Sequence, residues 1–154
     1  MVQKGHTLKL NPYYLSGFVD GEGCFAISIN KRTKSKDKLY VRLKFEIELR
    51  EDDKEILEQI RATLGCGYLY RLDYAKYKKW MPHYKYMVSN FSDLDEKVIP
   101  FFRKYPLQGK KRNNFEAFCK VSELIREKKH LTKEGVAEAK RIRESVNNKK
   151  RINR

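Results

Sequence analysis

Two segments near the start of the chain alternate between apolar and polar residues. Apolar side chains occupy every second position of 25–29, followed in alternation by the polar Ser28, Asn30 and Arg32. Apolar side chains again occupy every second position of 41–47, with charged residues between them. A period of two places successive side chains on opposite faces of a strand. The basic, polar run 33–38 separates the two segments. The pattern therefore predicts a β-hairpin with one buried face and one polar face.

Helical patterns flank this hairpin. Asn11-Pro12 is a typical helix start, with a capping Asn and proline in the first turn, and residues 21–23 predict the exit, because glycine tolerates a positive φ. After the hairpin, an apolar stripe from Ile56 to Leu64 predicts a second helix, ended by Gly65. Asp52 and Glu55 before it have the spacing of a capping box.

The rest of the chain repeats the alternation once and then becomes helical. Strands are expected at 68–74 and 83–89, and a helix is expected from Ser92-Asp93 onward, with a kink or early end at Pro100. Two further helices are expected around 115–125 and 136–146. We therefore expect an α+β fold in a single domain, residues 1–154, with its core at about 10–130 and a C-terminal helix and basic tail at about 131–154.

The net charge of the chain indicates what class of molecule it binds. Thirty-five Lys and Arg against twenty Asp and Glu give a net charge of +15 and a pI near 9.7. Such a field attracts polyanions, nucleic acid before anionic membrane. No stretch approaches the roughly 18 apolar residues of a membrane span, and the three scattered cysteines indicate neither a disulfide framework nor a zinc site. We expect no membrane partner and no small-molecule substrate.

The segment Leu15–Gly23, followed by Cys24-Phe25, reads LSGFVDGEG. It resembles the motif that names the LAGLIDADG homing endonucleases. The resemblance continues through 64–67, Pro106-Leu107, Lys110-Lys111 and Leu131-Thr132, and covers most of residues 10–148. It implies an αββαββα fold with a saddle-shaped four-stranded antiparallel sheet and extra C-terminal helices. It also implies metal-dependent hydrolysis of both strands of a long DNA site.

The acids of the motif suggest the chemistry. Small residues at 16 and 17 would let a second helix approach closely, which would bring two acidic helix ends together. There they could hold Mg²⁺, which prefers oxygen ligands, with Mn²⁺ expected to substitute. We predict that Glu22 is a ligand, and the resemblance implies a second contact from the Gly21 carbonyl. The alternative is that Asp20 and Glu22 are solvated acids, although the helix macrodipole opposes acids at that end.

The resemblance also places a lysine near the cleaved phosphate, where it would stabilise charge in the transition state. Lys110 and Lys111 are both candidates, with Lys111 slightly favoured, and a basic loop that touches distal phosphates is the alternative. One departure from the family pattern concerns the end of the second strand, where Leu49 and Asp53 replace a polar and a basic residue. Glu48 and Arg50 are neighbours that could substitute for them, and Arg50 is the better candidate to contact phosphate.

The polar face of the sheet is expected to read base edges in the major groove. On the first hairpin the predicted contacts are Ser28, Asn30, Arg32, Lys34, Lys36, Arg42, Lys44 and Glu46. On the later strands they are Tyr68, Tyr70, Lys85 and Met87. The second set is less well defined, because a slip of one residue turns every side chain to the other face.

A single copy of the motif predicts assembly. One copy supplies one acidic helix end and half of a reading surface, so two chains related by a two-fold axis would match a near-palindromic site. The predicted homodimer interface comprises Tyr14, Leu15, Gly17, Phe18 and Asp20. Derivation from a parent with two motifs is the open alternative.

Other functions on the same fold remain open from the sequence: an intron RNA maturase or a non-catalytic DNA-binding regulator. An unrelated basic RNA-binding protein, such as a ribosomal protein, would make the motif accidental. The expected location is intracellular, either in an organelle (chloroplast or mitochondrion) or in prokaryotic cytoplasm.

Overall fold

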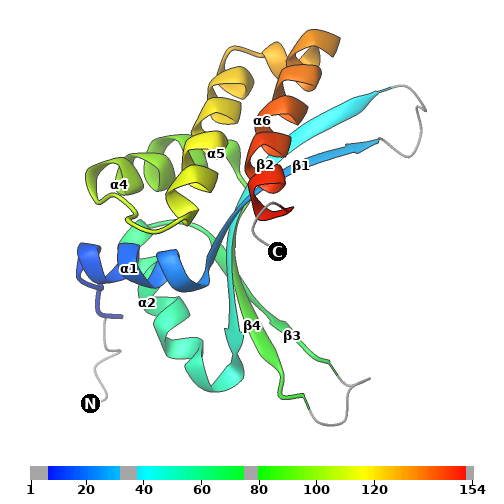
Figure 1. Ribbon diagram of the computed structural model, residues 1–154. Helices are drawn as coiled ribbons and strands as arrows, with labels where there is room; N and C mark the ends of the chain where they lie inside the picture. The colour runs from blue at the N-terminus through cyan, green and yellow to red at the C-terminus, as the bar shows by residue number, and fades with distance from the viewer. Residues whose placement is uncertain (1–6, 32–37, 75–79, 152–154) are drawn as a thin grey trace, which may run out of the picture. The chain divides into compact units, whose positions relative to one another are not determined.

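The computed structural model describes residues 7–31, 38–74 and 80–151, with side chains of the last helix described through residue 147. Its main elements, drawn in Figure 1, are α1 (Pro12–Glu22), β1 (Gly23–Lys31), β2 (Leu39–Arg50), α2 (Lys54–Leu64), β3 (Tyr68–Leu72), β4 (His83–Val88), α4 (Ile99–Lys104), α5 (Lys111–Arg126) and α6 (Lys133–Arg151). Short turns connect them: η1 (Glu51–Asp53), α3 (Phe91–Asp93), η2 (Leu94–Val98) and η3 (Lys129–Leu131).

The strands form one four-stranded sheet in the order β1-β2-β4-β3. β4 pairs antiparallel with both β2 and β3. The predicted α+β class and the order of helices and strands are confirmed. The described residues form two compact units, one from residues 7–24, 45–74 and 80–107 (the first unit), the other from residues 25–31, 38–44 and 108–151 (the second unit).

The core of the first unit contains the apolar side chains of α1, α2, β4 and the helical segment 91–104. Phe45 is fully buried, with ring centroids 5.6 Å from Phe102 and 6.2 Å from Tyr86. Tyr86 is also fully buried, and its hydroxyl donates to the Cys66 carbonyl at 2.8 Å. Burial raises the pKa of Tyr86 far above its usual range, so the hydroxyl stays a neutral donor.

The second unit has its own core, built around Phe25. The Phe25 ring lies 5.2 Å from Phe115 and 5.4 Å from Phe118, both on α5. Val41 and Leu43 of β2 are buried, as the alternation predicts, and Val136 and Ala139 of α6 are buried too. Helices α5 and α6 pack side by side in this unit (Figure 1).

The start of α1 matches the prediction from the sequence, but its end does not. Asn11 caps the helix as predicted, with its Oδ1 accepting from the Tyr13 amide at 2.9 Å. The prediction of a positive φ at the exit is wrong, because Gly23 has φ −80°. Glycine is needed there for space: a Cβ at position 23 would lie 2.6 Å from Val19 Cγ1. Gly65 does close α2 with φ +74°.

Two other helix starts differ from prediction. Asp53 precedes α2 without a side-chain cap bond, and Asp52 pairs with Arg50 at 2.9 Å, so the predicted capping box is wrong. Asn90 caps the next helical segment, accepting from the Asp93 amide at 3.1 Å. An early end at Pro100 is also wrong: the wider π turn η2 comes before it, and α4 continues to Lys104.

Candidate nucleic-acid and metal-binding site

Glu22 is the last residue of α1 and is exposed to solvent. Among the described residues, no hydrogen bond or ion pair involves its carboxylate. The last turn of α1 carries no basic residue that would offset the negative end of the helix. Gly21 beside it is exposed, and a Cβ there would meet no atom within 4 Å. Glu22 thus stands in an electrostatically unfavourable place, with open space around the neighbouring backbone.

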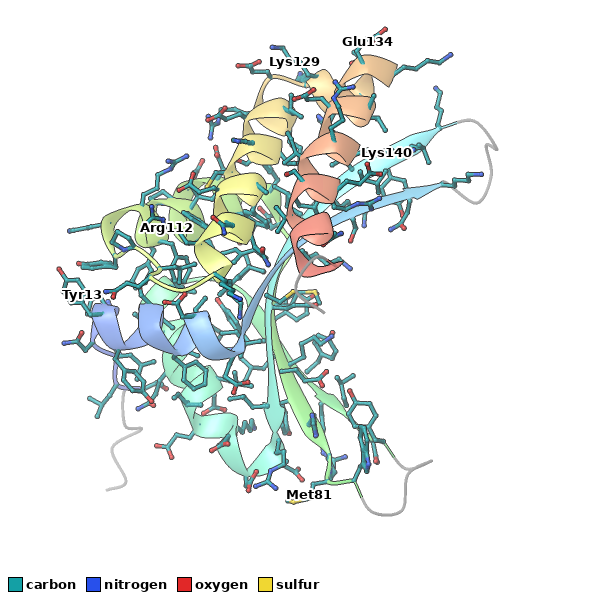
Figure 2. The ribbon with its side chains drawn as sticks, viewed as in Figure 1. Tyr13, Met81, Arg112, Lys129, Glu134 and Lys140 are labelled. Atoms are coloured by element: carbon teal, nitrogen blue, oxygen red, sulfur yellow. The ribbon has the colours of Figure 1, made fainter. Side chains whose placement is uncertain are left out.

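The outward face of α1 is a strip of aromatic and glycine residues. Tyr14, Gly17, Phe18 and Gly21 follow helical spacing, and the Tyr14 and Phe18 rings stack with centroids 6.3 Å apart. A Cβ placed at Gly17, as at Gly21, would meet no atom within 4 Å. Tyr13 extends from the start of the helix and is 69% exposed (Figure 2). The helix therefore presents a face on which another backbone could come close.

Two residues of the predicted contact face point inward instead. Leu15 is fully buried in the first unit, so its place in the predicted dimer interface is wrong. Ser16 is 4% exposed and donates its hydroxyl to the Tyr105 carbonyl at 2.7 Å. Because Ser16 fixes α1 to the segment after α4, it is not one of the small residues on the open face. Asp20 is half-buried.

The pairing of β2, β3 and β4 settles which side chains of the first unit share a face. Glu46 lies opposite Met87, which lies opposite Tyr68. One step along, Glu48 lies opposite Lys85, which lies opposite Tyr70. Because paired residues point to the same face, these six side chains share one face, and the buried Phe45, Ile47, Tyr86 and Val88 share the other. We call the six the reading rows.

Within the reading rows, Met87 is covered. It is 8% exposed, and the Tyr68 hydroxyl donates to its sulfur at 3.3 Å. Tyr68 is 47% exposed, and its ring stacks on Tyr70 with centroids 5.9 Å apart. Met87 is therefore a support beneath Tyr68, which corrects its prediction as a direct contact to DNA.

A polar network occupies the Glu48 end of the reading rows. One Glu48 oxygen accepts from the Tyr74 hydroxyl at 3.1 Å, and the other lies 3.2 Å from His83 Nδ1. Lys85 Nζ lies 3.8 Å from Glu48 and 3.6 Å from Glu46. Desolvation lowers the pKa of Lys85, but attraction to Glu46, with smaller contributions from Tyr70 and Glu48, outweighs it, so the pKa is raised. Lys85 is thus a charged hydrogen-bond donor whose position is fixed by Glu46 and Glu48.

Sequence reasoning missed Tyr74 and His83 as members of this network. Tyr74 follows the end of β3, and its ring lies 5.1 Å from His83 and 5.8 Å from Trp80, edge to face in both cases. Desolvation raises the pKa of Tyr74, and its hydrogen bond to Glu48 adds to the shift. The two residues come from different strand ends, so only the strand register could have brought them together.

In the second unit, the predicted contacts lie on β1 and β2. Asn30 and Arg42 are exposed, and Ser28 and Lys44 are half-buried. The Arg42 guanidinium lies 4.9 Å from the centre of the Tyr40 ring. Arg32, Lys34 and Lys36 lie outside the described residues.

The predicted lysines stand at the start of α5. Lys111 is the first residue of the helix and half-buried, and Lys110 before it is exposed. The first turn of α5 holds no acidic residue, so the lysines add to the positive end of the helix, where anions are favoured. Arg50 belongs to the first unit and forms an exposed ion pair with Asp52 at 2.9 Å. That pair leaves Arg50 only weakly held.

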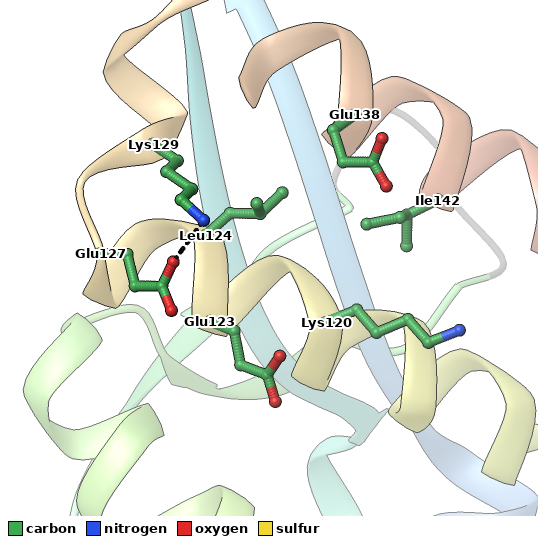
Figure 3. A pocket seen from close by; sticks show the side chains of 7 residues that line it. All are labelled: Lys120, Glu123, Leu124, Glu127, Lys129, Glu138 and Ile142. Carbon is green, nitrogen blue, oxygen red and sulfur yellow. Dashed lines mark ion pairs between the residues drawn. The ribbon is translucent and has the colours of Figure 1, made fainter. Parts of the chain in front are cut away.

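A depression of about 270 Å³ lies between α5 and α6 in the second unit (Figure 3). Glu127 and Lys129 form an ion pair at 2.7 Å on its wall, and Lys120, Glu123 and Glu138 also line it. None of the predicted site residues contributes to it, and its mixed charges do not favour a particular ligand.

The sequence profile of LAGLIDADG endonucleases matches residues 15–122, more than two thirds of the chain. The chain belongs to the LAGLIDADG endonuclease family. The match includes all of the reading rows and both lysines at the start of α5. It begins within α1, at the motif that ends with Glu22 and Gly23.

Individual proteins that are similar to this LAGLIDADG chain support the same family assignment. It is 32% identical over 127 residues to the probable intron-encoded endonuclease 3 of Neurospora crassa, covering 82% of this chain and 22% of that protein. I-SmaMI bound to an uncleaved DNA target with calcium ions aligns with a TM-score of 0.80 and 33% identity, over 89% of this chain and 45% of that one. The homing endonuclease I-TnaI aligns with a TM-score of 0.77 and 31% identity, over 88% and 86%.

This LAGLIDADG chain thus spans less than a quarter of the Neurospora relative and less than half of I-SmaMI. In the part of the chain that the structure describes, no group of three or more His, Cys, Asp or Glu side chains is arranged to hold a metal ion. No helix among the described residues is long and apolar enough to cross a membrane.

Proposed function

We propose that the chain is a homing endonuclease that hydrolyses both strands of double-stranded DNA at a long, near-palindromic site, with divalent metal. The observation that carries the proposal is the placement of Glu22. It lies in the family-matched segment, at the negative end of α1, exposed and with no hydrogen bond or ion pair to any residue that the structure describes. A carboxylate there costs a few tenths to about 1 kcal/mol of helix stability, which a bound cation would reverse.

The donor set suits a hard divalent ion. The Glu22 carboxylate and the Gly21 carbonyl both offer oxygen, the ligand atom that Mg²⁺ and Mn²⁺ prefer. When bound, such an ion lowers the pKa of water and neutralises charge on the phosphate. Glu22 and Gly21 would hold it, while Lys110 or Lys111 and Arg50 would donate to phosphate oxygens. Both lysines stand at the positive end of α5, where an anion is favoured, and the family resemblance slightly favours Lys111.

DNA is the proposed substrate. Support comes from the net charge of +15 and from DNA-bound I-SmaMI among the similar structures. The reading rows of the first unit and the exposed polar positions of β1 and β2, Asn30 and Arg42, would face base edges and phosphates in the major groove. The name of the Neurospora relative further supports an origin within an intron.

We propose that the complete enzyme contains two copies of this fold, supplied here by a homodimer. Tyr14, Gly17, Phe18 and Gly21 form the face of α1 that a second α1 would meet, and the two glycines permit close contact between backbones. Each copy would contribute one Glu22. The pairing of two identical halves matches a near-palindromic DNA site.

A cleavage selection tests this function. The full chain is incubated with a library of randomised palindromic duplexes in Mg²⁺, in Mn²⁺ or in a chelator, and cut ends are sequenced. We expect one discrete site cut on both strands in either metal and no cutting in the chelator. If the chain cuts no duplex but binds folded intron RNA tightly, the endonuclease proposal is wrong and the maturase alternative replaces it.

A further inference from the structure

The reading rows place one acid and one base side by side. Glu46 on β2 and Lys85 on β4 are diagonal neighbours on the same face, because Glu46 pairs with Met87 and Lys85 pairs with Glu48. Glu46 Oε2 lies 3.6 Å from Lys85 Nζ, and the two side chains are 25% and 22% exposed. An acceptor and a donor are therefore presented together toward the same side of the sheet.

Glu46 and Glu48 differ in the number of hydrogen-bond and ion-pair partners that their carboxylates have. Glu48 has three partners, Tyr74, His83 and Lys85. Among the described residues, the ion pair with Lys85 is the only polar contact of the Glu46 carboxylate. Glu46 keeps an oxygen for an external donor, while Glu48 fixes the position of Lys85.

The spacing of this pair matches the edge of one base pair. In a C·G pair, the cytosine N4 amino group donates to guanine O6, so these two atoms lie about 2.9 Å apart. Both face the major groove, with guanine N7 next to O6. A carboxylate can accept from N4 while an ammonium donates to O6 and N7. A·T fits less well, because adenine N7 would repel the carboxylate and the thymine methyl would face the ammonium.

We propose that the Glu46–Lys85 ion pair reads a single C·G base pair in each half of the DNA site, with Glu46 on cytosine and Lys85 on guanine, and that Glu48 is a positioning residue for Lys85. This inference rests on the proposed DNA-binding function. It explains why a chain with a large excess of positive charge keeps a carboxylate on a surface that meets phosphates. Without a donor on the DNA, that carboxylate would only weaken binding.

A binding selection tests the inference separately from cleavage. The full chain is incubated with the randomised duplex library in chelator, and bound DNA is sequenced for the wild type, Glu46→Gln and Glu51→Gln. Glu51 is the matched control: it pairs with Arg71 at 3.1 Å but lies beyond the end of β2, outside the reading rows. We expect Glu46→Gln to lose about tenfold or more of the preference for C·G at one position per half-site and to favour adenine there. Glu51→Gln should keep the wild-type preferences.

A charge swap keeps the ion pair and reverses its direction. The swap Glu46→Lys with Lys85→Glu is made in a Glu48→Gln background, because the new glutamate would otherwise face the carboxylate of its cross-strand partner Glu48. This variant should select G·C where the wild type selects C·G, with a cooperative melting transition as evidence of folding. If the wild type selects and cuts a discrete site but both variants keep its base preferences, the inference is wrong and the proposed function stands. If the wild type selects no DNA sequence at all, both fail.

Discussion

At the residue scale, Gly23 shows how tightly the end of α1 is joined to β1. Val19, in the last turns of α1, is fully buried, so its side chain cannot turn out into solvent without loss of apolar burial. A Cβ at position 23 would lie 2.6 Å from Val19 Cγ1 and 3.0 Å from the Val19 carbonyl oxygen. The short distance to backbone means that the helix end itself would have to shift, and Glu22 immediately before it would shift as well.

We therefore expect Gly23→Ala to lower the free energy of unfolding by about 1–3 kcal/mol, the usual cost of overpacking. Urea denaturation followed by circular dichroism measures it. Glu116→Ala is the control for an added alanine, because Glu116 is exposed within α5, lies outside the proposed interface, and alanine is tolerated well in a helix interior. Equal stability of Gly23→Ala and the wild type would show that the close contact with Val19 does not constrain the glycine.

At the scale of elements, the two faces of α1 have different roles. Leu15 and Ser16 hold it within the first unit, whereas Tyr14, Gly17 and Phe18 face outward. The sequence could not separate these faces, because α1 is apolar on nearly all sides and helical periodicity therefore leaves its rotation undetermined. Hydrogen bonds between residues distant in sequence, such as that of Ser16 with Tyr105, fix the rotation.

For Gly17→Leu we expect a folded chain that no longer pairs with a second copy. The leucine would extend from the outward face and keep the two helices apart, so sedimentation should show monomer at concentrations where the wild type is dimeric. Glu55→Leu, at an exposed position of α2, controls for added apolar surface. A Gly17→Leu chain that assembles as the wild type does would exclude this face from the interface.

Strands followed the sequence more closely than helix ends did. The alternation in β2 predicted both its buried residues, such as Phe45, and its polar ones, such as Glu46. Helix starts at Asp53 and Asn90 were missed, because several neighbouring polar residues can cap a helix and only the path of the backbone chooses among them. The burial of Met87 under Tyr68 was missed for a similar reason: it depends on pairing between strands.

At the scale of the whole molecule, the sequence predicted the fold class and the family, because the motif at 15–23 and the αββαββα order both lie in one continuous chain. The roles of Glu22, Lys110, Lys111 and Arg50 stay predictions. They depend on a second copy of the fold, on DNA and on metal, in addition to the residues of this chain. We therefore claim that Glu22 is required for the cleavage of DNA but not for the binding of DNA.

Cleavage of one selected duplex by the wild type and by Glu22→Gln tests that claim most directly. Both proteins are assayed in Mg²⁺ for double-strand cutting and in chelator for binding, with Glu55→Gln as the control for loss of an exposed carboxylate. We expect Glu22→Gln to bind as the wild type does but to cut on the order of 100-fold more slowly or not at all, because the metal loses its charged ligand. Wild-type cutting by Glu22→Gln would contradict the account.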